Sequence, residues 1–278
     1  MTYLFNERKL LKKILIYSSM ILISIIILYP ILLMVKISLI HPQGFFKTHK
    51  DLLWPQQGLT LTHWKNVYNS GLLGPSLFKS LRVASITTII AILIAAPASY
   101  VISRIGKKWK YLFIISLFIS RMFLEVGIAL LISIRFLSWD LIDISLGLIL
   151  AHLIKVLPYV AWILVGTFEV IPRSLEEVSF VDGAGKIRTL CRIVFPLSLP
   201  GISVAAILVW LESWNEFTYA LYLTISKNTL PLQTYYYLNR GGIFNSAAYA
   251  TIITIPVIII TFILQRYIKA GMLTGAVK

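Results

Sequence analysis

The chain has 278 residues, of which 58% are hydrophobic and only 13% are charged, and its mean hydropathy is +0.83. A soluble protein of this length cannot bury so much apolar side chain, so the composition indicates a membrane protein. The net charge of +15 would suggest nucleic-acid binding in a soluble protein. Here the basic residues flank apolar segments, where they attract anionic lipid headgroups, and we expect membrane lipid but no nucleic acid as a partner.

Six segments are long and apolar enough to cross a bilayer as helices, which need about 20 residues. They are residues 14–35, 83–103, 111–136, 144–168, 199–224 and 246–265. The first follows a basic stretch like that of a signal peptide, but its apolar run is too long and lacks a small-residue cleavage pattern. We therefore expect a retained anchor, and an all-α membrane protein with six transmembrane helices.

The distribution of lysine and arginine predicts the orientation of these helices. Most of the cations outside the spans lie on the side of the N-terminus, and the positive-inside rule makes that side cytoplasmic. We expect a multi-pass protein of the cell membrane with both termini in the cytoplasm. The predicted organisation is a cytoplasmic N-terminus (1–13), a six-helix domain (14–268) with a cytoplasmic loop at 172–196, and a cytoplasmic tail (269–278).

Some polar residues interrupt the third and fourth spans. Arg121 and Glu125 are spaced i,i+4, and His152 and Lys155 are spaced i,i+3. Charges inside a membrane mark a solute pathway or a gate by default, and the alternative is a structural ion pair within the bundle. The four histidines have no ligand-like spacing, so no metal site is expected, and the lone Cys191 cannot form an intrachain disulfide.

The loop at 172–196 contains a predicted short helix. Pro172 disfavours continuation of the fourth span, and Ser174 with Glu177 fits a capping box. The apolar residues of this helix recur every three positions and predict one apolar face, with the polar residues pointing elsewhere. That face is formed by Leu175, Val178 and Val181, and the polar residues are Glu176, Ser179 and Asp182.

Gly183 permits a sharp exit from this helix, and a second amphipathic piece is expected at about 186–195. The GAGK sequence at 183–186 is no phosphate-binding loop, because Phe180 and Ile187 stand where the motif needs glycine and a hydroxyl residue. Two interpretations remain for the short helix: it rests on the lipid surface, or it inserts into a groove of a partner.

The fifth span carries a predicted polar stripe. Glu212, Asn215, Glu216 and Tyr219 are spaced i, i+3, i+4 and i+7, and Trp214 is nearby. Polar residues of a span normally face the bundle or a water-filled cavity. The stripe therefore predicts either a solute pathway with groups that suit a sugar, or a packing surface against a second membrane subunit.

Three groups of residues resemble a known family. The loop resembles the EAA loop of ABC importer permeases, through Glu177, Val178, Ser179, Asp182, Gly183, Ala184, Ile193, Phe195, Pro196 and Leu197. The blocks Trp214–Phe217 with Ala220 and Leu221, and Gln265–Tyr267 with Gly271 and Thr274–Lys278, resemble the second permease of maltose-type carbohydrate importers. The resemblance covers residue 60 to the end, and Val178 and Ser179 stand where the family favours alanine.

The resemblance implies a type I ABC importer permease fold and a set of partners. These are a second permease in a heterodimer, two ATPase subunits, an extracytoplasmic solute-binding protein and a sugar. It implies that Glu177–Ala184 form the ATPase-coupling loop and that the C-terminal Thr274, Gly275, Ala276, Val277 and Lys278 also contact the ATPases. ATP and Mg would be used by the ATPases, and this chain would bind no cofactor and have no catalytic residue.

Two other classes of function are alternatives to an ABC permease. A secondary transporter should show discontinuous helices, repeated halves and an ion-coupling site, and no repeat is visible. A membrane enzyme should show converging nucleophile, base or metal ligands, and only isolated glutamates and histidines occur. The sequence therefore predicts a permease subunit of an ATP-driven importer of a sugar or oligosaccharide, with an autonomous secondary transporter as the alternative.

Overall fold

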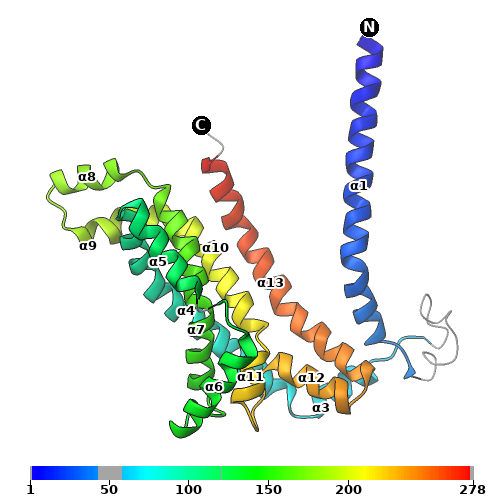
Figure 1. Cartoon of the computed structure of the whole chain (residues 1–278). Coiled ribbons are helices and arrows are strands. Elements are labelled where there is room, and N and C mark those ends of the chain that lie inside the picture. Colours follow the sequence, from blue (N-terminus) through cyan, green and yellow to red (C-terminus); the bar gives the residue numbers. More distant parts are fainter. Residues whose placement is uncertain (1, 43–57, 120, 276–278) are drawn as a thin grey trace. The chain divides into compact units, whose positions relative to one another are not determined.

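The computed structural model describes residues 2–42, 58–119 and 121–275, and the side chains within 12–42, 58–119 and 121–263. This part of the chain is nearly all helical, and the extended pairing within it is one antiparallel bridge between Ile40 and Leu59. The helices, labelled in Figure 1, are α1 (Thr2–Ile37), α3 (Thr62–Asn69), α4 (Leu73–Arg104), α5 (Lys107–Ile119), α6 (Glu125–Ser138), α7 (Ser145–Glu169), α8 (Arg173–Val181), α9 (Lys186–Thr189), the π-helix η2 (Leu190–Val194), α10 (Phe195–Trp214), α11 (Thr218–Leu223), α12 (Leu230–Arg240) and α13 (Ile243–Gly275).

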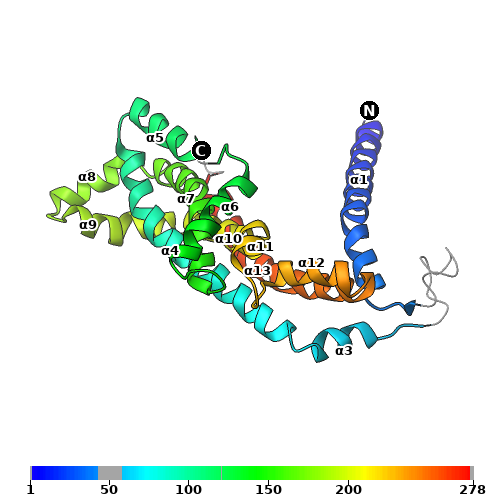
Figure 2. The same cartoon turned by 60° about the horizontal axis from the view of Figure 1, so that its bottom comes forward.

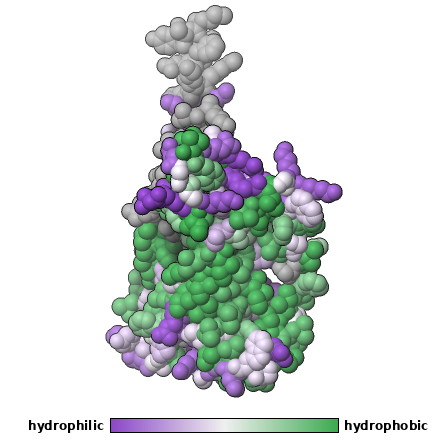
Figure 3. All heavy atoms as spheres, turned by 90° about the vertical axis from the view of Figure 1, so that its left-hand side faces the viewer, coloured by the Kyte–Doolittle hydropathy of each residue, from purple (hydrophilic) through white to green (hydrophobic). Residues whose placement is uncertain are grey.

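Five helical stretches of the described chain are long and apolar enough to cross a membrane. They are Lys12–Ile37, Leu73–Arg104, Ser145–Glu169, Lys186–Trp214 and Ile243–Ile263. Figure 3 shows one face of the molecule with hydrophobic side chains across its middle and hydrophilic ones gathered above and below. This distribution fits a protein that spans a bilayer, and the predicted all-α membrane fold is confirmed.

The predicted third span, 111–136, is wrong as a single helix. It is divided into α5 and α6, of 13 and 14 residues, and the intervening segment ends at Leu124, whose backbone is extended. Lys110, near the start of α5, pairs with Glu169 at the end of α7, and the loop after α6 carries Asp143, which pairs with Lys79 near the start of α4. The helices α5 and α6 together therefore span the bundle from one end to the other.

The chain divides into two compact units. Unit 1 comprises residues 1–71 and 234–252, and unit 2 comprises residues 72–233 and 253–278. In unit 1 the ring of His63, a residue of α3, contacts the carbonyl oxygen of Ile40 at 2.9 Å and stacks on Phe244. These contacts hold the segment after α1 against α3 and α13, and a Tyr237–Tyr249 ring pair joins α12 to α13 within the same unit.

The core of unit 2 is formed by α4, α7 and α10, which lie side by side in Figures 1 and 2. The face of α4 in this core consists of small buried residues three or four positions apart, which let helix backbones approach closely. These residues are Ala84, Thr87, Ala91, Ala95 and Ser99. At Gly201 of α10, an added Cβ atom would lie 2.2 Å from Cγ2 of Thr167 in α7, so this crossing requires glycine.

Candidate functional site

The short helix predicted in the loop at 172–196 is present as α8. Its start differs from the prediction: Pro172, with an extended backbone, is the N-cap, and no side chain caps the helix, so the capping box of Ser174 and Glu177 is wrong. The helix stops at Asp182 because Gly183 adopts a φ of +80°, a conformation that favours glycine. The predicted sharp exit at Gly183 is confirmed.

Of the three polar residues named for this helix, Glu176 and Ser179 are buried and Asp182 is exposed. Glu176 is 7% exposed, and its Oε1 lies 2.5 Å from the guanidinium of Arg104, the last residue of α4. The hydroxyl of Tyr100, one turn earlier on α4, donates a hydrogen bond of 2.6 Å to Oε2 of Glu176. Two helices that are far apart in the sequence are thereby joined through one carboxylate.

A second polar contact holds the C-terminal half of α8. Ser179 is buried, and its Oγ lies 2.7 Å from Oγ1 of Thr189 in α9, so the two hydroxyls share a hydrogen bond. The backbone NH of Ala184 donates to the carbonyl oxygen of Ser179 and closes the turn at Gly183. The second amphipathic piece is α9 with η2, and it continues directly into α10 instead of forming a separate helix.

The apolar face of α8 is exposed. Leu175, Val178 and Val181 have exposed fractions of 42%, 60% and 88%. Among the residues of the predicted coupling loop, Glu177, Asp182 and Gly183 are also exposed, Ala184 is partly buried and Ser179 is buried. An amphipathic helix that buries its polar side in its own subunit leaves the apolar side available to another surface.

The predicted polar stripe on the fifth span is wrong as a helical stripe. α10 ends at Trp214, and Asn215 and Glu216 lie between it and α11. Trp214 is 1% exposed and stacks on Trp210, with ring centroids 4.9 Å apart, so it packs the core. Asn215 points back to the carbonyl oxygen of Leu211.

Glu216 has a structural role at the start of α11. Its carboxylate accepts hydrogen bonds from the backbone NH groups of Tyr219 and Ala220, at 2.7 and 3.1 Å, and lies 3.2 Å from Nε2 of His152. Nδ1 of His152 lies 2.7 Å from the hydroxyl of Ser213. All these groups are buried. A carboxylate that accepts the free NH groups of a helix N-terminus stabilises that helix.

Four other charged residues form what we call the charged cluster: Arg121, Glu125, Lys155 and Glu212. Lys155 of α7 lies 2.7 Å from Glu125, the first residue of α6, and 3.4 Å from Glu212 of α10. Glu212 also lies 3.4 Å from Arg121, in the segment between α5 and α6. The proposed i,i+4 pair of Arg121 with Glu125 does not form, because the helix is broken between them and each has a partner on another helix.

The charged cluster lies against a cavity of about 100 Å³. Arg121, Glu125 and Lys155 line it together with Tyr219 and apolar side chains. Oppositely charged groups at the break between α5 and α6 can exchange their contacts with one another for contacts with a polar solute. Charged residues inside a membrane mark a candidate functional site by default.

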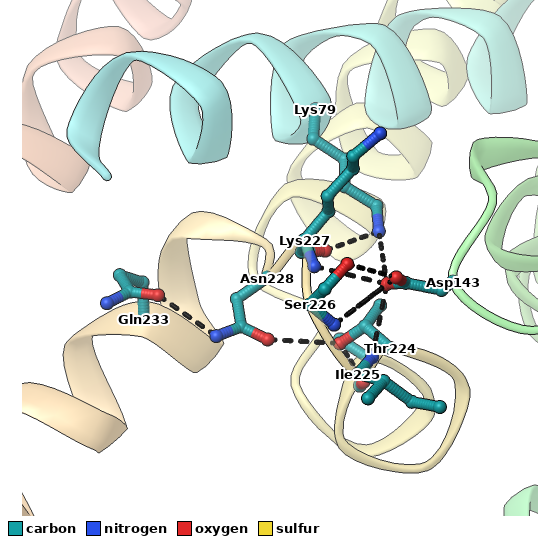
Figure 4. Close-up of polar contacts among 9 residues, drawn as sticks. Lys79, Asp143, Thr224, Ile225, Ser226, Lys227, Asn228 and Gln233 are labelled. Atoms are coloured by element: carbon teal, nitrogen blue, oxygen red, sulfur yellow. Dashed lines mark hydrogen bonds and ion pairs between the residues drawn. The ribbon is translucent and has the colours of Figure 1, made fainter. Parts of the chain in front are cut away.

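Another charged contact lies at the end of unit 2 opposite α8. The carboxylate of Asp143 accepts hydrogen bonds from the backbone NH groups of Ile225, Ser226 and Lys227, at 3.1–3.3 Å, and from the hydroxyl of Ser226 (Figure 4). Lys79 of α4 lies 3.9 Å from Asp143 and donates to the carbonyl oxygen of Lys227. Asp143 itself has a φ of 66°, which aspartate tolerates better than most residues.

These contacts determine the charge of Asp143. Burial alone would raise its pKa, but the hydroxyl of Ser226 and the three backbone NH groups stabilise the carboxylate and lower the pKa from 3.8 to about 2. The carboxylate is therefore ionised at any physiological pH and ties the segment 225–227 to the loop before α7. No local sequence pattern predicts this contact, and the available signal is an acidic residue beside a span.

The remaining predicted residues lie at the C-terminus. Thr274 and Gly275 fall in the last turn of α13, beyond the described side chains, and Ala276, Val277 and Lys278 lie outside the described residues. Among the described residues, no group of three or more histidine, cysteine, aspartate or glutamate side chains could hold a metal ion.

Comparison with known proteins identifies the class. Residues 86–274 match the family of binding-protein-dependent transport system inner membrane components, and the chain belongs to this family. A putative ABC transporter permease of Streptomyces antibioticus is 34% identical over 79% of this chain and 97% of its own. The trehalose transport system permease SugB of Mycobacterium tuberculosis is 32% identical over 79% of this chain and 82% of its own.

The fold agrees with that family. A chain of a bacterial ABC transporter that imports the acidic polysaccharide alginate superimposes with a TM-score of 0.72, at 18% identity, over 91% of this chain and 95% of its own. The chain is therefore a permease subunit of a binding-protein-dependent ABC importer in the inner membrane.

Proposed function

We propose that the chain is one of two dissimilar permeases that form the pathway for a sugar or oligosaccharide. The solute would be delivered by an extracytoplasmic binding protein, and transport would be driven by two ATPase subunits that bind the ATP and Mg. The names of two relatives support a sugar: SugB is a trehalose permease, and a permease of Thermococcus litoralis, 32% identical over 72% of this chain, is named for trehalose and maltose.

The observation that carries this proposal is the inverted burial of α8. Its apolar face is exposed, while Glu176 and Ser179 fasten the polar face to α4 and α9. A helix resting on lipid needs no such attachment, whereas a helix that transmits force must be joined firmly to a span. We therefore favour docking of α8 in a groove of an ATPase, and the contact would include Glu177, Val178, Asp182 and Gly183. Because the ATPases are cytoplasmic, this docking would also place both chain termini in the cytoplasm.

The solute pathway is proposed to pass the charged cluster. Of the predicted pathway residues, Glu212 and Tyr219 support this reading, because Glu212 pairs with two cations and Tyr219 lines the cavity. Trp214, Asn215 and Glu216 serve packing and capping instead. Hydroxyl groups of a sugar can replace the contacts between Glu212 and its cations. If Glu212→Gln left uptake unchanged in a complex that still binds its ATPases, the pathway would have to lie elsewhere.

A substitution on α8 tests the coupling. Val181→Asp places a charge on the most exposed apolar position, and a charge in a desolvated contact costs about 2 kcal/mol or more, or about thirtyfold in affinity. We expect the ATPase subunits to be lost on affinity purification and ATP-driven uptake to fall by a similar factor. The matched control is Val170→Asp, at a valine that is 82% exposed but lies outside α8. Equal retention of the ATPases in both variants would refute the docking assignment.

One observation supports the alternative of an autonomous secondary transporter: the crossing formed by α5 and α6 is discontinuous and has charged residues at its break. Reconstitution of the purified chain alone separates the two functions. Solute uptake driven by an ion gradient, without any ATPase, would favour the alternative and overturn the proposal.

A further inference from the structure

A cavity of about 540 Å³ lies between α5 and α7 in unit 2. It is much larger than the cavity at the charged cluster and falls within the usual range for ligand sites in proteins. Its lining consists of Lys107, Lys110, Tyr111, Ile114, Trp162, Ile163, Val165, Gly166 and Glu169. None of these residues belongs to α8, to the charged cluster or to the contacts of Asp143.

The lining is charged at one end and apolar at the other. Lys107 and Lys110 begin α5, and Glu169 ends α7, so these three residues lie where the membrane-spanning parts of α4 and α7 also end. Trp162 lies seven residues earlier on α7, about 10 Å deeper at 1.5 Å per residue. An edge-to-face contact of Trp162 with Phe118, at 6.1 Å, adds a further aromatic ring on the α5 side.

The charged end has an excess of positive charge. Lys110 forms an ion pair with Glu169, so the two lysines and one glutamate of the lining leave one net positive charge. α5 begins at Lys107, and the free NH groups of a helix N-terminus add positive potential at the same place. This end of the cavity therefore suits an anionic group.

The position of the cavity favours a ligand from the membrane. None of the described side chains of α5 is buried, and Tyr111 and Trp162 are 62% and 51% exposed. Aromatic side chains beside lysines are typical of the boundary between headgroups and hydrocarbon. The hydroxyl groups of a sugar would find no hydrogen-bonding partners in the apolar half of the cavity. A soluble subunit would have to reach about 10 Å into the bilayer to fill it.

We propose that this cavity binds an anionic phospholipid of the leaflet at the α8 end of unit 2. The phosphate lies at Lys107 and the start of α5, and an acyl chain lies along Trp162. Basic pockets between membrane helices bind anionic headgroups in this way. Such a lipid packs between α5 and α7, and α7 leads directly into α8. The site does not depend on which solute is transported.

Lipid titration with native mass spectrometry tests the site. The complex is purified in mild detergent and titrated with dioleoyl phosphatidylglycerol or dioleoyl phosphatidylcholine. Lys107→Gln should weaken phosphatidylglycerol binding about fivefold, which corresponds to about 1 kcal/mol for one lysine near the headgroups. Binding of phosphatidylcholine should not change.

The chain offers a matched control and an independent variant. Lys108→Gln removes the same charge from the next residue, which is not part of the lining, and should leave binding unchanged. Gly166→Leu fills the cavity without removing charge, and its Cβ would have no atom within 4 Å, so the fold should tolerate it. It should weaken phosphatidylglycerol binding at least as much as Lys107→Gln.

Two results would overturn the proposal. Equal weakening by Lys107→Gln and Lys108→Gln would mean that the lipid is attracted by surface charge alone. Release of another membrane subunit by Gly166→Leu, with lipid binding unchanged, would mean that the cavity is filled by a partner chain.

Discussion

Two carboxylates at opposite ends of unit 2 fasten segments to the same long helix, α4, but they do so differently. Asp143 is held by three backbone NH groups and one hydroxyl of the segment 225–227, with Lys79 of α4 beside it. Glu176 is held by two side chains, those of Tyr100 and Arg104 near the end of α4.

This difference indicates different mechanical roles. Backbone NH groups can follow a carboxylate only if the main chain moves, so Asp143 fixes its loop in one geometry. The contacts of Glu176 depend on the side-chain torsions of tyrosine and arginine, which can turn while the hydrogen bonds persist. We infer that the Asp143 end is a rigid tie and that the Glu176 end is a joint through which α8 can tilt and still pull on α4.

Removing the charge of Glu176 should have the largest effect. Glu176→Gln leaves Arg104 without its carboxylate partner in a largely buried place, and breaking such an ion pair costs about 3 kcal/mol or more. We expect a lower unfolding temperature of the purified complex and a loss of ATP-driven uptake. Scanning calorimetry and uptake into proteoliposomes measure the two effects.

The neighbouring residue provides the control for this variant. Glu177 is exposed, so Glu177→Gln should leave the unfolding temperature unchanged when both variants are compared without the ATPase subunits, whose binding would itself add stability. Equal stability of the Glu176→Gln complex and the wild type would contradict the joint.

Asp143→Asn should have an intermediate effect, confined to the other end. Hydrogen bonds to a charged group contribute about 1.5–3 kcal/mol, so the amides of residues 225–227 should exchange hydrogen about ten- to a hundredfold faster in the variant. Hydrogen exchange with mass spectrometry measures this difference. Exchange of the α8 amides should not change, and a change there would contradict the independence of the two ends.

The pH dependence of this difference follows from the lowered pKa of Asp143. The folded-state pKa of about 2 lies below the usual value of 3.8, so the carboxylate stabilises the fold fully above about pH 4. Its contribution is lost only as the pH falls from there through 2. The difference between variant and wild type, corrected for intrinsic exchange, should therefore stay constant from pH 8 to pH 5.

The sequence predicted the spans better than the way their polar residues are used. Long apolar runs located the spans because hydrocarbon demands them, and the punctuation by Pro172 and Gly183 located α8. Periodicity predicted the apolar face of α8, but it could not predict which polar residues attach the helix to the rest of the chain. The apolar face of α8 is exposed, and Glu176 is buried against Arg104 and Tyr100, which lie 72 and 76 positions away in the sequence, where no local pattern reveals them.

The break between α5 and α6 and the end of α10 at Trp214 were missed for a related reason. Neither place has the proline or glycine that usually interrupts a helix at the point of change. The available signals were charges in an apolar run, Arg121 with Glu125 and Glu212 with Glu216. Spacing alone places each pair on one helix. In the structure Arg121 pairs with Glu212, Glu125 pairs with Lys155, and Glu216 contacts His152 and the backbone of α11.

Tyr100→Phe should have the smallest effect and sharpens the description of the joint. The substitution removes one hydrogen bond to Glu176 but keeps the ring, whose edge-to-face contact with Phe168 has a centroid distance of 5.9 Å. Because Arg104 still pairs with the carboxylate, the cost should be about 1.5 kcal/mol, the lower end for a bond to a charged group. If Arg104 alone transmits the motion of α8, uptake should stay near the wild-type rate while the unfolding temperature falls slightly. A loss of uptake as severe as that of Glu176→Gln would instead mean that the joint needs both side chains, and α8 would then be held as rigidly as the loop at Asp143.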